Sequence, residues 1–558
     1  MTADRRRNAA IWYAQDGFDP TAKGINGRRV AGESFLRGYM LHADAEEFVT
    51  LVHTPADAEA FRSQAQALRP DLPVRGVALQ VPHRIAPLGT VSYAGPNFDA
   101  ECWRRAPYGQ AAYSICGITH TTSTTAVMQG FFDLRMSPQA EWDAVICTSN
   151  AVRASVLAQM DLIDAHIRAR FGATPPPRPQ LPVLPLGIHT ADFQPDAAAG
   201  KALRKSLGAG PGDVVFTTIS RLSPHAKFDP LPVYLALRAA QAELAPGKRL
   251  FLVLCGIFRE DYARKVFEEG AARLMPDVGL LITDGADPAA RKAALSGADV
   301  FLFMIDNIQE TFGLAPIEAM AAGLPVLVSD WDGMKDTVTP EVGFRITTRT
   351  LRAERTAHEA LRYQGRVDNA LQYGAAVSAM TEVDVAEMAR RMVDLAENPD
   401  LRKKMGAAGR LRAAEYDWRG IIPRMQDIWA DLAARRERGM AGARRYPAAA
   451  LPVAPSPFGL FASYPTEQIG FAAGRYVAAD LGTRPDIAAT LALRDYGALK
   501  RIFESAAHIG AVHAAIVAGG AAGADRAAVE AVTGLGALTV ERILIWLLKY
   551  DFIRRATG

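Results

Sequence analysis

Short apolar runs alternate with longer amphipathic stretches through the first third of the chain. The apolar runs predict strands at residues 9–14, 47–52, 74–79, 112–118 and 144–148. The amphipathic stretches predict helices at residues 32–40, 55–67 and 151–171. Such alternation is typical of βαβ units, which build a parallel sheet with helices on its faces. A proline-rich segment at 174–182 interrupts the pattern, and one more short strand is predicted at 181–186.

A second alternating series follows a boundary near residues 192–213, where Asp, Ala, Gly and Pro cluster. Its strands are predicted at residues 213–220, 250–255, 278–283, 299–304, 325–329 and 343–347. Its helices are predicted at residues 228–243, 260–274, 288–296 and 315–322. Two α/β domains that face each other place a ligand crevice between the carboxyl ends of both sheets.

The rest of the chain predicts helices and a separate last unit. Amphipathic helices are expected at residues 383–397, 401–416 and 418 to about 438, while residues 349–380 are longer than an α/β domain needs and predict an insertion. We predict a Rossmann-like domain at 1–195, a second at 196–438, a linker at 439–456 and a mainly helical accessory domain at 457–558.

The composition is that of a folded globular protein, because 49% of the 558 residues are hydrophobic and 22% are charged. The 63 basic and 60 acidic residues leave a formal net charge of +3. So small an excess argues against a protein dedicated to nucleic-acid binding.

The cysteines and the apolar segments bear on the compartment. Four cysteines without C-x2-C spacing predict neither a disulfide framework nor a structural zinc site, which favours a reducing, cytoplasmic location. The apolar run 9–14 is too short for a signal peptide, and the uncharged stretch 506–524 is too weakly hydrophobic for a membrane span. The basic stretch 435–445 leaves open either a solvated linker or a peripheral contact with the inner face of the membrane.

The strongest chemical signal lies in residues 301–338. A predicted strand ends near Met304, a loop carries Glu310, and Gly313 precedes a helix that contains Glu318. A helix N-terminus preceded by glycine offers free N–H groups and a favourable dipole to a phosphate. Two carboxylates beside such a site can accept hydrogen bonds from the hydroxyls of a sugar. Without the neighbouring motif, the same two glutamates would also be explained as an acidic pair exposed to solvent.

Four segments, in order, resemble glycosyltransferase family 4, the retaining sugar-nucleotide enzymes of the GT-B fold. The sequence ETFGLAPIEAMAAGLPVLVSD at 310–330 resembles the family signature. Ser220-Arg221-Leu222 with Lys227 resembles the diphosphate-binding segment. Residues 184–193 resemble the segment that leads into the second domain, and residues 405–418 resemble the C-terminal helices. The resemblance covers residues 9–432 and implies a GT-B fold, in which two Rossmann-like domains face each other across a crevice.

Arg221 and Lys227 follow the first strand of the second domain, where two cations can neutralise a diphosphate leaving group. The alternative is a pair of solvated surface cations. The resemblance implies that Glu318 holds the ribose hydroxyls and that Glu310 contacts the transferred sugar. It further implies that the backbone N–H groups around Gly313 and Leu314 bind the distal phosphate, and that the base lies near residues 283–286, beginning with Thr283. Thr311 and Phe312, in the same loop, are the remaining donor-binding positions.

The first domain offers two weaker candidates. Gly24, Gly27 and Gly32 resemble the family's glycine loop at the crevice, although a plain turn explains them equally well. His120 follows a predicted strand, where the family often has a histidine near the donor sugar; a structural histidine is the alternative.

Two positions depart from the family, and one further segment suggests other chemistry. Phe228 stands where a glycine is expected after Lys227, and His189 stands where an aspartate is common. Asp330 and Asp332 form a D-x-D sequence that binds a metal in another glycosyltransferase fold, but here a turn is the preferred interpretation and no metal or other cofactor is expected.

The implied activity is transfer of a sugar, with retention at the anomeric carbon, from a nucleotide diphosphate donor such as a UDP- or GDP-sugar. The acceptor is a saccharide, a lipid-linked molecule or a protein. Two alternatives stay open: a GT-B isomerase or hydrolase of sugar nucleotides, and a non-catalytic sensor with a helical output domain.

The last hundred residues resemble a winged helix in outline, with predicted helices at 525–533 and 538–548 followed by residues 549–555. Ten basic and nine acidic residues after 450 do not make a phosphate-binding surface, so DNA binding is disfavoured. Packing, homodimer formation or docking of an acceptor protein are the remaining roles.

Overall fold

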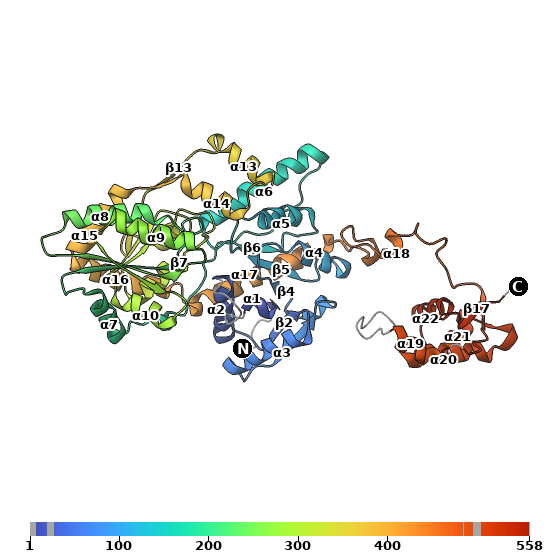
Figure 1. The fold of residues 1–558 in the computed structure, drawn as a ribbon. Helices are drawn as coiled ribbons and strands as arrows, with labels where there is room; N and C mark the ends of the chain where they lie inside the picture. The colour runs from blue at the N-terminus through green and yellow to red at the C-terminus, as the bar shows by residue number, and fades with distance from the viewer. Residues whose placement is uncertain (1–6, 19–26, 484, 495–503, 557–558) are drawn as a thin grey trace. The chain divides into compact units, whose positions relative to one another are not determined.

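The computed structural model describes residues 7–18, 27–483, 485–494 and 504–556. The chain divides into two compact units, Met1–Ala454 and Pro455–Gly558. The first unit holds two six-stranded sheets flanked by helices (Figure 1). The expected fold class, two parallel-sheet α/β domains followed by a mainly helical region, is confirmed.

All strands of the first sheet run parallel, in the order β3-β2-β1-β4-β5-β6. Its strands are β1 (Ala10–Tyr13), β2 (Phe48–Val52), β3 (Val74–Ala78), β4 (Thr90–Ser92), β5 (Ser114–Ile118) and β6 (Ala144–Ile146). Its helices are α1 (Gln15–Phe18), α2 (Gly27–His42), α3 (Pro55–Leu68), α4 (Asp99–Arg105), α5 (Thr125–Met136) and α6 (Asn150–Phe171). Helices α2 and α3 contribute to the core on one face, and α4, α5 and α6 to the core on the other.

The second sheet is also parallel, in the order β12-β11-β10-β7-β8-β9. Its strands are β7 (Val214–Arg221), β8 (Leu250–Ile257), β9 (Gly279–Asp284), β10 (Val300–Phe303), β11 (Val326–Ser329) and β12 (Gly343–Ile346). Its helices are α7 (Ala197–Leu207), α8 (Pro230–Glu243), α9 (Asp261–Leu274), α10 (Pro288–Gly297), α11 (Leu314–Ala322), α12 (Met334–Thr337), α15 (Val385–Glu397) and α16 (Pro399–Ala414). In Figure 1, α8, α9 and α15 lie on one side of this sheet and α7 and α10 on the other.

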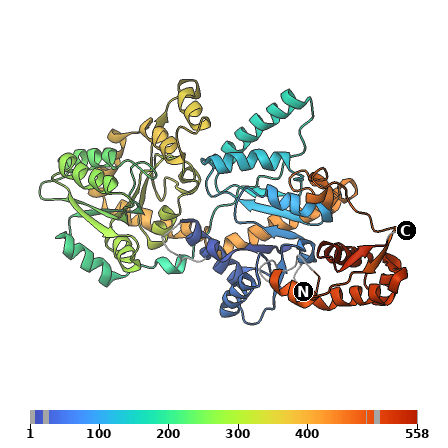
Figure 2. The same ribbon diagram turned by 45° about the vertical axis from the view of Figure 1, so that its right-hand side comes forward.

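The last helix of the first unit, α17 (Trp418–Gly439), packs on the first sheet rather than on the second domain that precedes it. Its apolar residues Trp418, Ile422 and Trp429 belong to the core beneath α2. The buried Arg436 donates to Ser114 Oγ of β5 at 2.8 Å. The chain therefore crosses between the two domains a second time. Figure 2 shows the two domains from another direction.

Several elements differ from the sequence prediction. Strand β4 and helices α4 and α5 were not predicted. The predicted strand 181–186 is wrong, because within it only Val183 forms a bridge, an isolated one to Cys147. Helix α7 lies inside the segment 192–213, in which the sequence predicts a domain boundary. It forms because Asp196 caps it, accepting from the N–H groups of Ala198 and Ala199.

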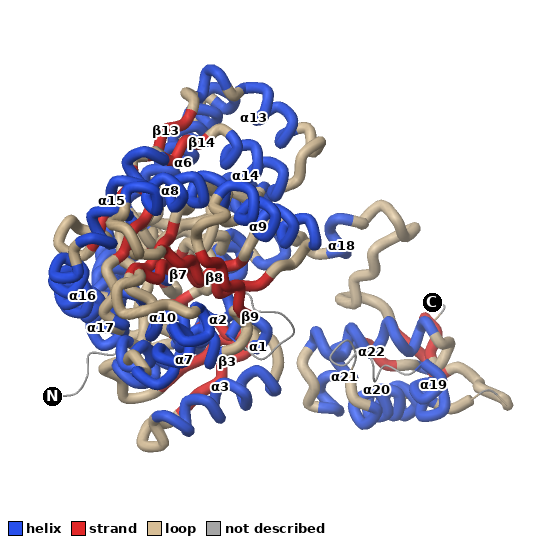
Figure 3. The backbone as a smooth tube through the Cα atoms, turned by 60° about the vertical axis from the view of Figure 1, so that its left-hand side comes forward, coloured by secondary structure: helices blue, strands red, loops and turns tan. Residues whose placement is uncertain are grey.

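The predicted insertion at 349–380 forms its own small layer. Strands β13 (Thr348–Thr350) and β14 (Thr381–Val383) pair antiparallel and enclose α13 (Ala357–Gln364) and α14 (Ala370–Ala379). Figure 3 shows these four elements together at one end of the second sheet domain.

The second unit has its own core, formed mainly by α20 (Ala506–Ala518), α21 (Arg526–Thr533) and α22 (Ala537–Lys549). The sheet β16-β15-β17 is antiparallel, with β15 (Arg475–Ala478), β16 (Ala524–Asp525) and β17 (Ile553–Arg555). Helices α18 (Pro457–Leu460) and α19 (Ile487–Arg494) precede this core. Across the described residues, no single helix is long and apolar enough for a membrane span. Helices α21 and α22 have the required length and apolar character only when counted together, and they are separated by a bend of 114°.

Candidate functional site

The centre of the candidate site is the ion pair between Lys227 Nζ and Glu310 Oε2, which lies at the carboxyl edge of the second sheet. The other oxygen of Glu310 accepts from the backbone N–H of Gly313 at 3.0 Å. Lys227 Nζ also lies 4.9 Å from the ring centroid of Phe303. Burial raises the pKa of Glu310, but Lys227 and the N–H groups of Gly313 and Phe312 outweigh it, so the pKa lies below the ordinary value.

Arg221, the last residue of β7, adds a second cation beside this pair. Its guanidinium lies 3.5 Å from Gln309 Oε1, at the limit of a hydrogen bond. Burial and the neighbouring Arg259 lower the pKa of Arg221, while Glu310 opposes this change. Lys227 is therefore paired with a carboxylate, whereas Arg221 beside it is held by a long contact with Gln309.

The N-terminus of α11 lies beside the pair. Gly313 adopts φ +84°, and a Cβ there would lie 2.6 Å from Met334 Sδ, so the position requires glycine. The first backbone N–H groups of a helix, here beginning with Leu314, have no intrahelical partner. Within the described residues, no side chain caps them. Thr311 and Phe312 are buried, which fixes the loop that leads into the helix.

Glu318 lies in the second turn of α11 and is partly buried. Burial raises the pKa of Glu318 to about 7, and Arg291 of α10 opposes the rise. No hydrogen bond to the Glu318 carboxylate occurs within the described part of the chain. A carboxyl group of this kind accepts hydrogen bonds from ligand hydroxyls when it is ionised, and it can also donate one when it is protonated. Arg291 was not predicted as a site residue.

Thr283, near the end of β9, has a buried hydroxyl that lies beside the Cys255 thiol. The backbone beside it is unusually close-packed. A Cβ on Gly285 would lie 2.7 Å from Gly256 Cα, and Arg291 donates to Gly285 O at 2.7 Å. The predicted base-binding segment is thus closely packed around Gly285, with the Thr283 hydroxyl as its buried polar side chain.

His120 lies opposite this cluster, in the first domain, and the two domains meet there. Thr311 Oγ1 donates to the backbone oxygen of His120 at 2.7 Å, and Thr148 Oγ1 donates to Thr311 O at 2.9 Å. The structure therefore brings Glu310, Lys227, Arg221 and the start of α11 together and sets His120 against the same loop.

The glycine loop of the first domain is placed differently from the prediction. Gly24 lies outside the described residues, Gly27 is the first residue of α2, and Gly32 lies within that helix. A Cβ on Gly32 would lie 2.6 Å from Gly17 O. Gly32 thus allows α2 to approach the segment after β1 closely, which is a packing requirement and not a loop.

Asp332 lies in the expected turn and also contacts the first domain across the crevice. Ser149 Oγ of the first domain donates to Asp332 Oδ1 at 2.7 Å, and the N–H of Asn150 donates to Asp336 Oδ2 at 2.7 Å. Burial raises the pKa of Asp332 to about 7, and Glu310 adds to the rise. Its φ of +41° is uncommon for a non-glycine residue. The signal for it in the sequence is the D-x-D segment, which begins at Asp330 directly after the strand that ends at Ser329.

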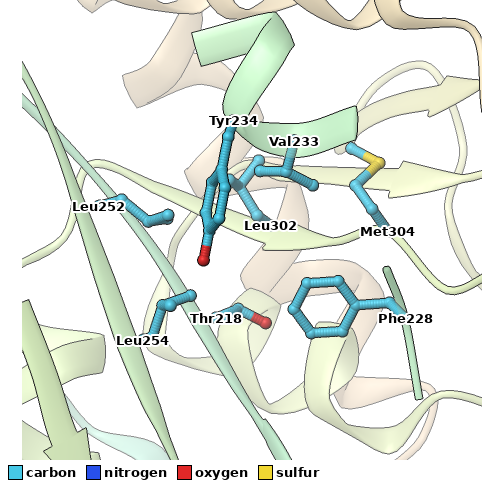
Figure 4. Close-up of a pocket in the computed structure, with 8 residues that line it drawn as sticks. All are labelled: Thr218, Phe228, Val233, Tyr234, Leu252, Leu254, Leu302 and Met304. Atoms are coloured by element: carbon cyan, nitrogen blue, oxygen red, sulfur yellow. The ribbon is translucent and has the colours of Figure 1, made fainter. Parts of the chain in front are cut away.

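The two departures from the family pattern have structural roles. Phe228 is buried against Phe267, and Figure 4 shows it in the apolar cavity beneath α8 with Tyr234 and Met304. It therefore belongs to the core and not to the surface of the loop after Lys227. His189 Nε2 lies 3.1 Å from Ser34 O, so this residue keeps a contact with the first domain.

The insertion also reaches the crevice, which the sequence did not indicate. Tyr363 is buried, stacks on Tyr373 with ring centroids 4.1 Å apart, and donates to Ser123 O of the first domain at 3.0 Å. Asn307, in the loop before Glu310, donates to Gly374 O at 3.3 Å. The insertion thus touches both the donor-side loop and the opposite domain.

Comparison with known proteins gives an independent view of the second domain. Residues 201–362 match the family model of "Glycosyl transferases group 1". One relative is a protein of Mycobacterium tuberculosis named GDP-mannose-dependent alpha-(1-6)-phosphatidylinositol monomannoside mannosyltransferase. It is 29% identical over 183 residues, which are 32% of this chain and 45% of that protein. A D-inositol 3-phosphate glycosyltransferase of Nocardia farcinica is 28% identical over 238 residues, 40% of this chain and 48% of that protein. The alignments thus span less than half of each relative.

Among solved structures, Anabaena Alr3699/HepE, described in complex with UDP and glucose, has a TM-score of 0.44 at 15% identity and covers 78% of this chain and 99% of its own. The family match is the more informative, because it includes Arg221, Lys227, Glu310 and Glu318. The second domain, from α7 to the insertion, is therefore similar to the glycosyl transferases of group 1.

Proposed function

We propose that the chain is a retaining glycosyltransferase of the family 4 type, which moves a sugar from a nucleotide diphosphate donor to an acceptor bound by the first domain. One observation carries the proposal: the Lys227–Glu310 pair lies at the uncapped start of α11 with Arg221 beside it. The family match over residues 201–362 supports it.

Each part of the cluster suits one part of such a donor. Arg221 and Lys227 neutralise the diphosphate, and the N–H groups at the start of α11 bind its distal phosphate. Glu318 accepts hydrogen bonds from the ribose, and Thr283 with its neighbouring backbone holds the base. Glu310 binds the transferred sugar, and His120 lies on its other side. The two cations supply the charge that the leaving group needs, so we propose that the transfer does not depend on a metal ion.

In the proposed reaction the acceptor oxygen bonds to the anomeric carbon while the bond from that carbon to the phosphate oxygen breaks. The acceptor hydroxyl proton passes to the departing phosphate oxygen, on the same face of the sugar. Arg221 and Lys227 stabilise the charge that develops there.

The location is part of the proposal. Cys102, Cys116, Cys147 and Cys255 are all buried free thiols. They agree with a reducing, cytoplasmic compartment.

The test begins with a thermal-shift screen against UDP-, GDP- and ADP-sugars, because a bound ligand raises the melting temperature. The donor so identified is then incubated with saccharide, glycolipid and protein acceptors, and the product is identified by mass spectrometry and its anomeric configuration by NMR. A glycosylated product with retained configuration supports the proposal. Release of free sugar alone favours the hydrolase, and binding without turnover favours the sensor.

The matched variants are Lys227→Ala and Lys248→Ala. Lys248 is also an ion-paired lysine of the second domain, bound to Glu397 at 2.9 Å away from the crevice. We expect a strong loss of transfer from the first variant alone. Near-normal turnover of folded Lys227→Ala would refute the diphosphate assignment.

A further inference from the structure

Asn307 lies in the loop that joins β10 to Glu310, and only 1% of its surface is exposed. Its side-chain amide nitrogen donates to His225 O at 2.6 Å and to Gly374 O at 3.3 Å. Its side-chain oxygen accepts from the backbone N–H of Gln309 at 3.0 Å. One buried side chain therefore joins three segments, which are the loop after β7, the insertion and its own loop.

The backbone around Asn307 adds to these links. The oxygen of Asn307 accepts from the N–H of Glu310 at 3.3 Å and from the indole N–H of Trp331 at 3.3 Å. The preceding residue, Asp306, accepts through its carboxylate from the N–H of Asp229 at 3.2 Å. The loop that carries Glu310 is thus tied to the loop after β7 on one side and to the segment after β11 on the other.

These contacts lie on both sides of Lys227 in the sequence. His225 and Asp229 flank Lys227, and both are bonded to the segment that leads to Glu310. Lys227 and Glu310 come from different loops, so the position of one charged group relative to the other depends on how firmly the two loops are joined. This matters for a reaction, because a displacement of about 1 Å can lower a rate about 100-fold.

The same side chain also fastens the insertion. Gly374 belongs to α14, and Tyr373 of α14 stacks on Tyr363 of α13. Tyr363 in turn donates to Ser123 O of the first domain. The insertion, the Glu310 loop and the loop after β7 therefore meet at Asn307.

We infer that Asn307 is a positioning residue, which holds Lys227 and Glu310 at the separation that the donor requires and makes the insertion part of the donor site. The inference rests on the proposed function, and Asn307 acts through Lys227 and Glu310 rather than on the donor itself. Asparagine suits the position because its amide donates two hydrogen bonds there and accepts one. Serine has a single hydroxyl donor, and an ionised aspartate has none.

The first test is Asn307→Ser, a neutral variant that keeps one donor. We expect kcat for sugar transfer to fall at least about 10-fold while KM for the donor changes less than about threefold, because misplaced groups raise the barrier of the reacting step more than they weaken binding.

Asn369→Ser is the matched control. Asn369 caps α14 in the same insertion by accepting from the N–H of Gln372, and serine is also a good capping residue, so this variant should keep both values. Melting curves show which variants are folded. An unchanged kcat in folded Asn307→Ser, a raised KM alone, or an equal loss in Asn369→Ser would overturn the inference.

The second test is the pH profile of Asn307→Asp, which a loss of packing alone would not change. Burial and the facing carbonyl oxygens should raise the pKa of the new carboxyl group. At about pH 6 the group is neutral and donates through its O–H, whereas at about pH 8.5 it is ionised and donates nothing. The ratio of wild-type to variant kcat should therefore be at least about fivefold larger at the higher pH.

Two controls accompany this profile. Ionisable groups on the contacting loops, among them His225, Asp229, Asp306 and Glu310, are present in both proteins and cancel in the ratio. Asn369→Asp should give a ratio that is constant with pH, because aspartate also caps a helix. A constant ratio for Asn307→Asp, folded at both pH values, would overturn the inference.

The positioning role and the proposed function fail separately. Sugar transfer by the wild type, with wild-type kcat in Asn307→Ser and a constant ratio in Asn307→Asp, would refute the positioning role while the glycosyltransferase stands. A wild-type chain that binds nucleotide but transfers sugar to no acceptor would refute the proposed function and with it this role of Asn307.

Discussion

Lys227 and Glu310 are 83 positions apart in the sequence and form an ion pair at the carboxyl edge of the second sheet. The side chains are mostly withdrawn from solvent, with 19% and 14% of their surfaces exposed. Each charge therefore depends on the other for compensation, and the pair joins the loop after β7 to the loop before α11.

This coupling predicts the result of a double-mutant cycle. Lys227→Met leaves a buried carboxylate and Glu310→Leu leaves a buried ammonium group, so each should lower the free energy of unfolding by about 1–4 kcal/mol. The double variant should lose less than the sum, because neither charge remains. Urea denaturation measures all three, and additive losses would contradict the coupling. Each single variant should also reduce transfer at least about 100-fold.

The raised pKa of Glu318 predicts a pH dependence of stability. Burial moves the pKa of Glu318 from 4.5 to about 7, so the folded state keeps this proton over a range in which the unfolded chain has lost it. The free energy of unfolding should therefore fall as the pH rises from about 5 to about 7, by about 1–2 kcal/mol for this group. Glu318→Gln should flatten the curve in urea titrations at several pH values. Asp306 and Asp332, whose pKa burial also raises to about 7, should preserve part of the slope. A variant curve as steep as the wild-type curve would contradict the assignment.

The left-handed backbone at Gly313 predicts that a methyl group is not tolerated. Gly313→Ala brings a Cβ within 2.6 Å of Met334 Sδ at φ +84° and should cost about 1–3 kcal/mol of stability and weaken nucleotide binding. Gly212→Ala is the control, because no atom lies within 4 Å of a Cβ there. Thermal denaturation and nucleotide titration of both variants test this, and equal behaviour would count against it.

The contact between Tyr363 and Ser123 predicts that the insertion helps to hold the domains together. Tyr363→Phe removes one hydrogen bond across the crevice and should reduce kcat/KM about 2- to 10-fold. Tyr373→Phe removes the hydroxyl of the stacked neighbour and should have little effect. Steady-state kinetics and small-angle scattering of both variants provide the check. An unchanged domain separation and unchanged kinetics in Tyr363→Phe would show that this contact is dispensable.

The division after Ala454 predicts that the donor site does not need the last unit. Among the described residues, the cores of the two sheet domains extend no further than Leu432, and the core of the last unit begins at Ile469. A chain that ends at Ala454 should keep its melting temperature and its nucleotide binding. Calorimetry tests this prediction, and transfer assays with light scattering show whether acceptor use or oligomeric state depends on the missing unit. Loss of nucleotide binding would contradict it.

The pattern of the sequence was most informative where strands are buried on both faces. The second-sheet strands were found close to their true bounds, because continuous apolar runs between amphipathic helices have few other interpretations. It failed where elements are short or depend on their ends. Strand β4 has three residues, and α7 owes its start to the cap at Asp196 within a segment rich in loop-forming residues.

The residue types of the site are likewise visible in the sequence. Glu310, Gly313, Arg221 and Lys227 lie at strand ends, in the loops that follow them or at a helix start, and Glu318 lies in the second turn of that helix. The sequence by itself therefore determined two alternating α/β series and most of the chemistry along them. The tertiary structure alone decided which groups meet. Because β10 pairs with β7 in the second sheet, the loop of Glu310 lies against the loop of Lys227. Helix α17 returns to the first sheet, and the two domains meet at Thr311. For this reason the site also includes His120, Asp332 and Tyr363, which are too far from it in the sequence for any local pattern to reveal.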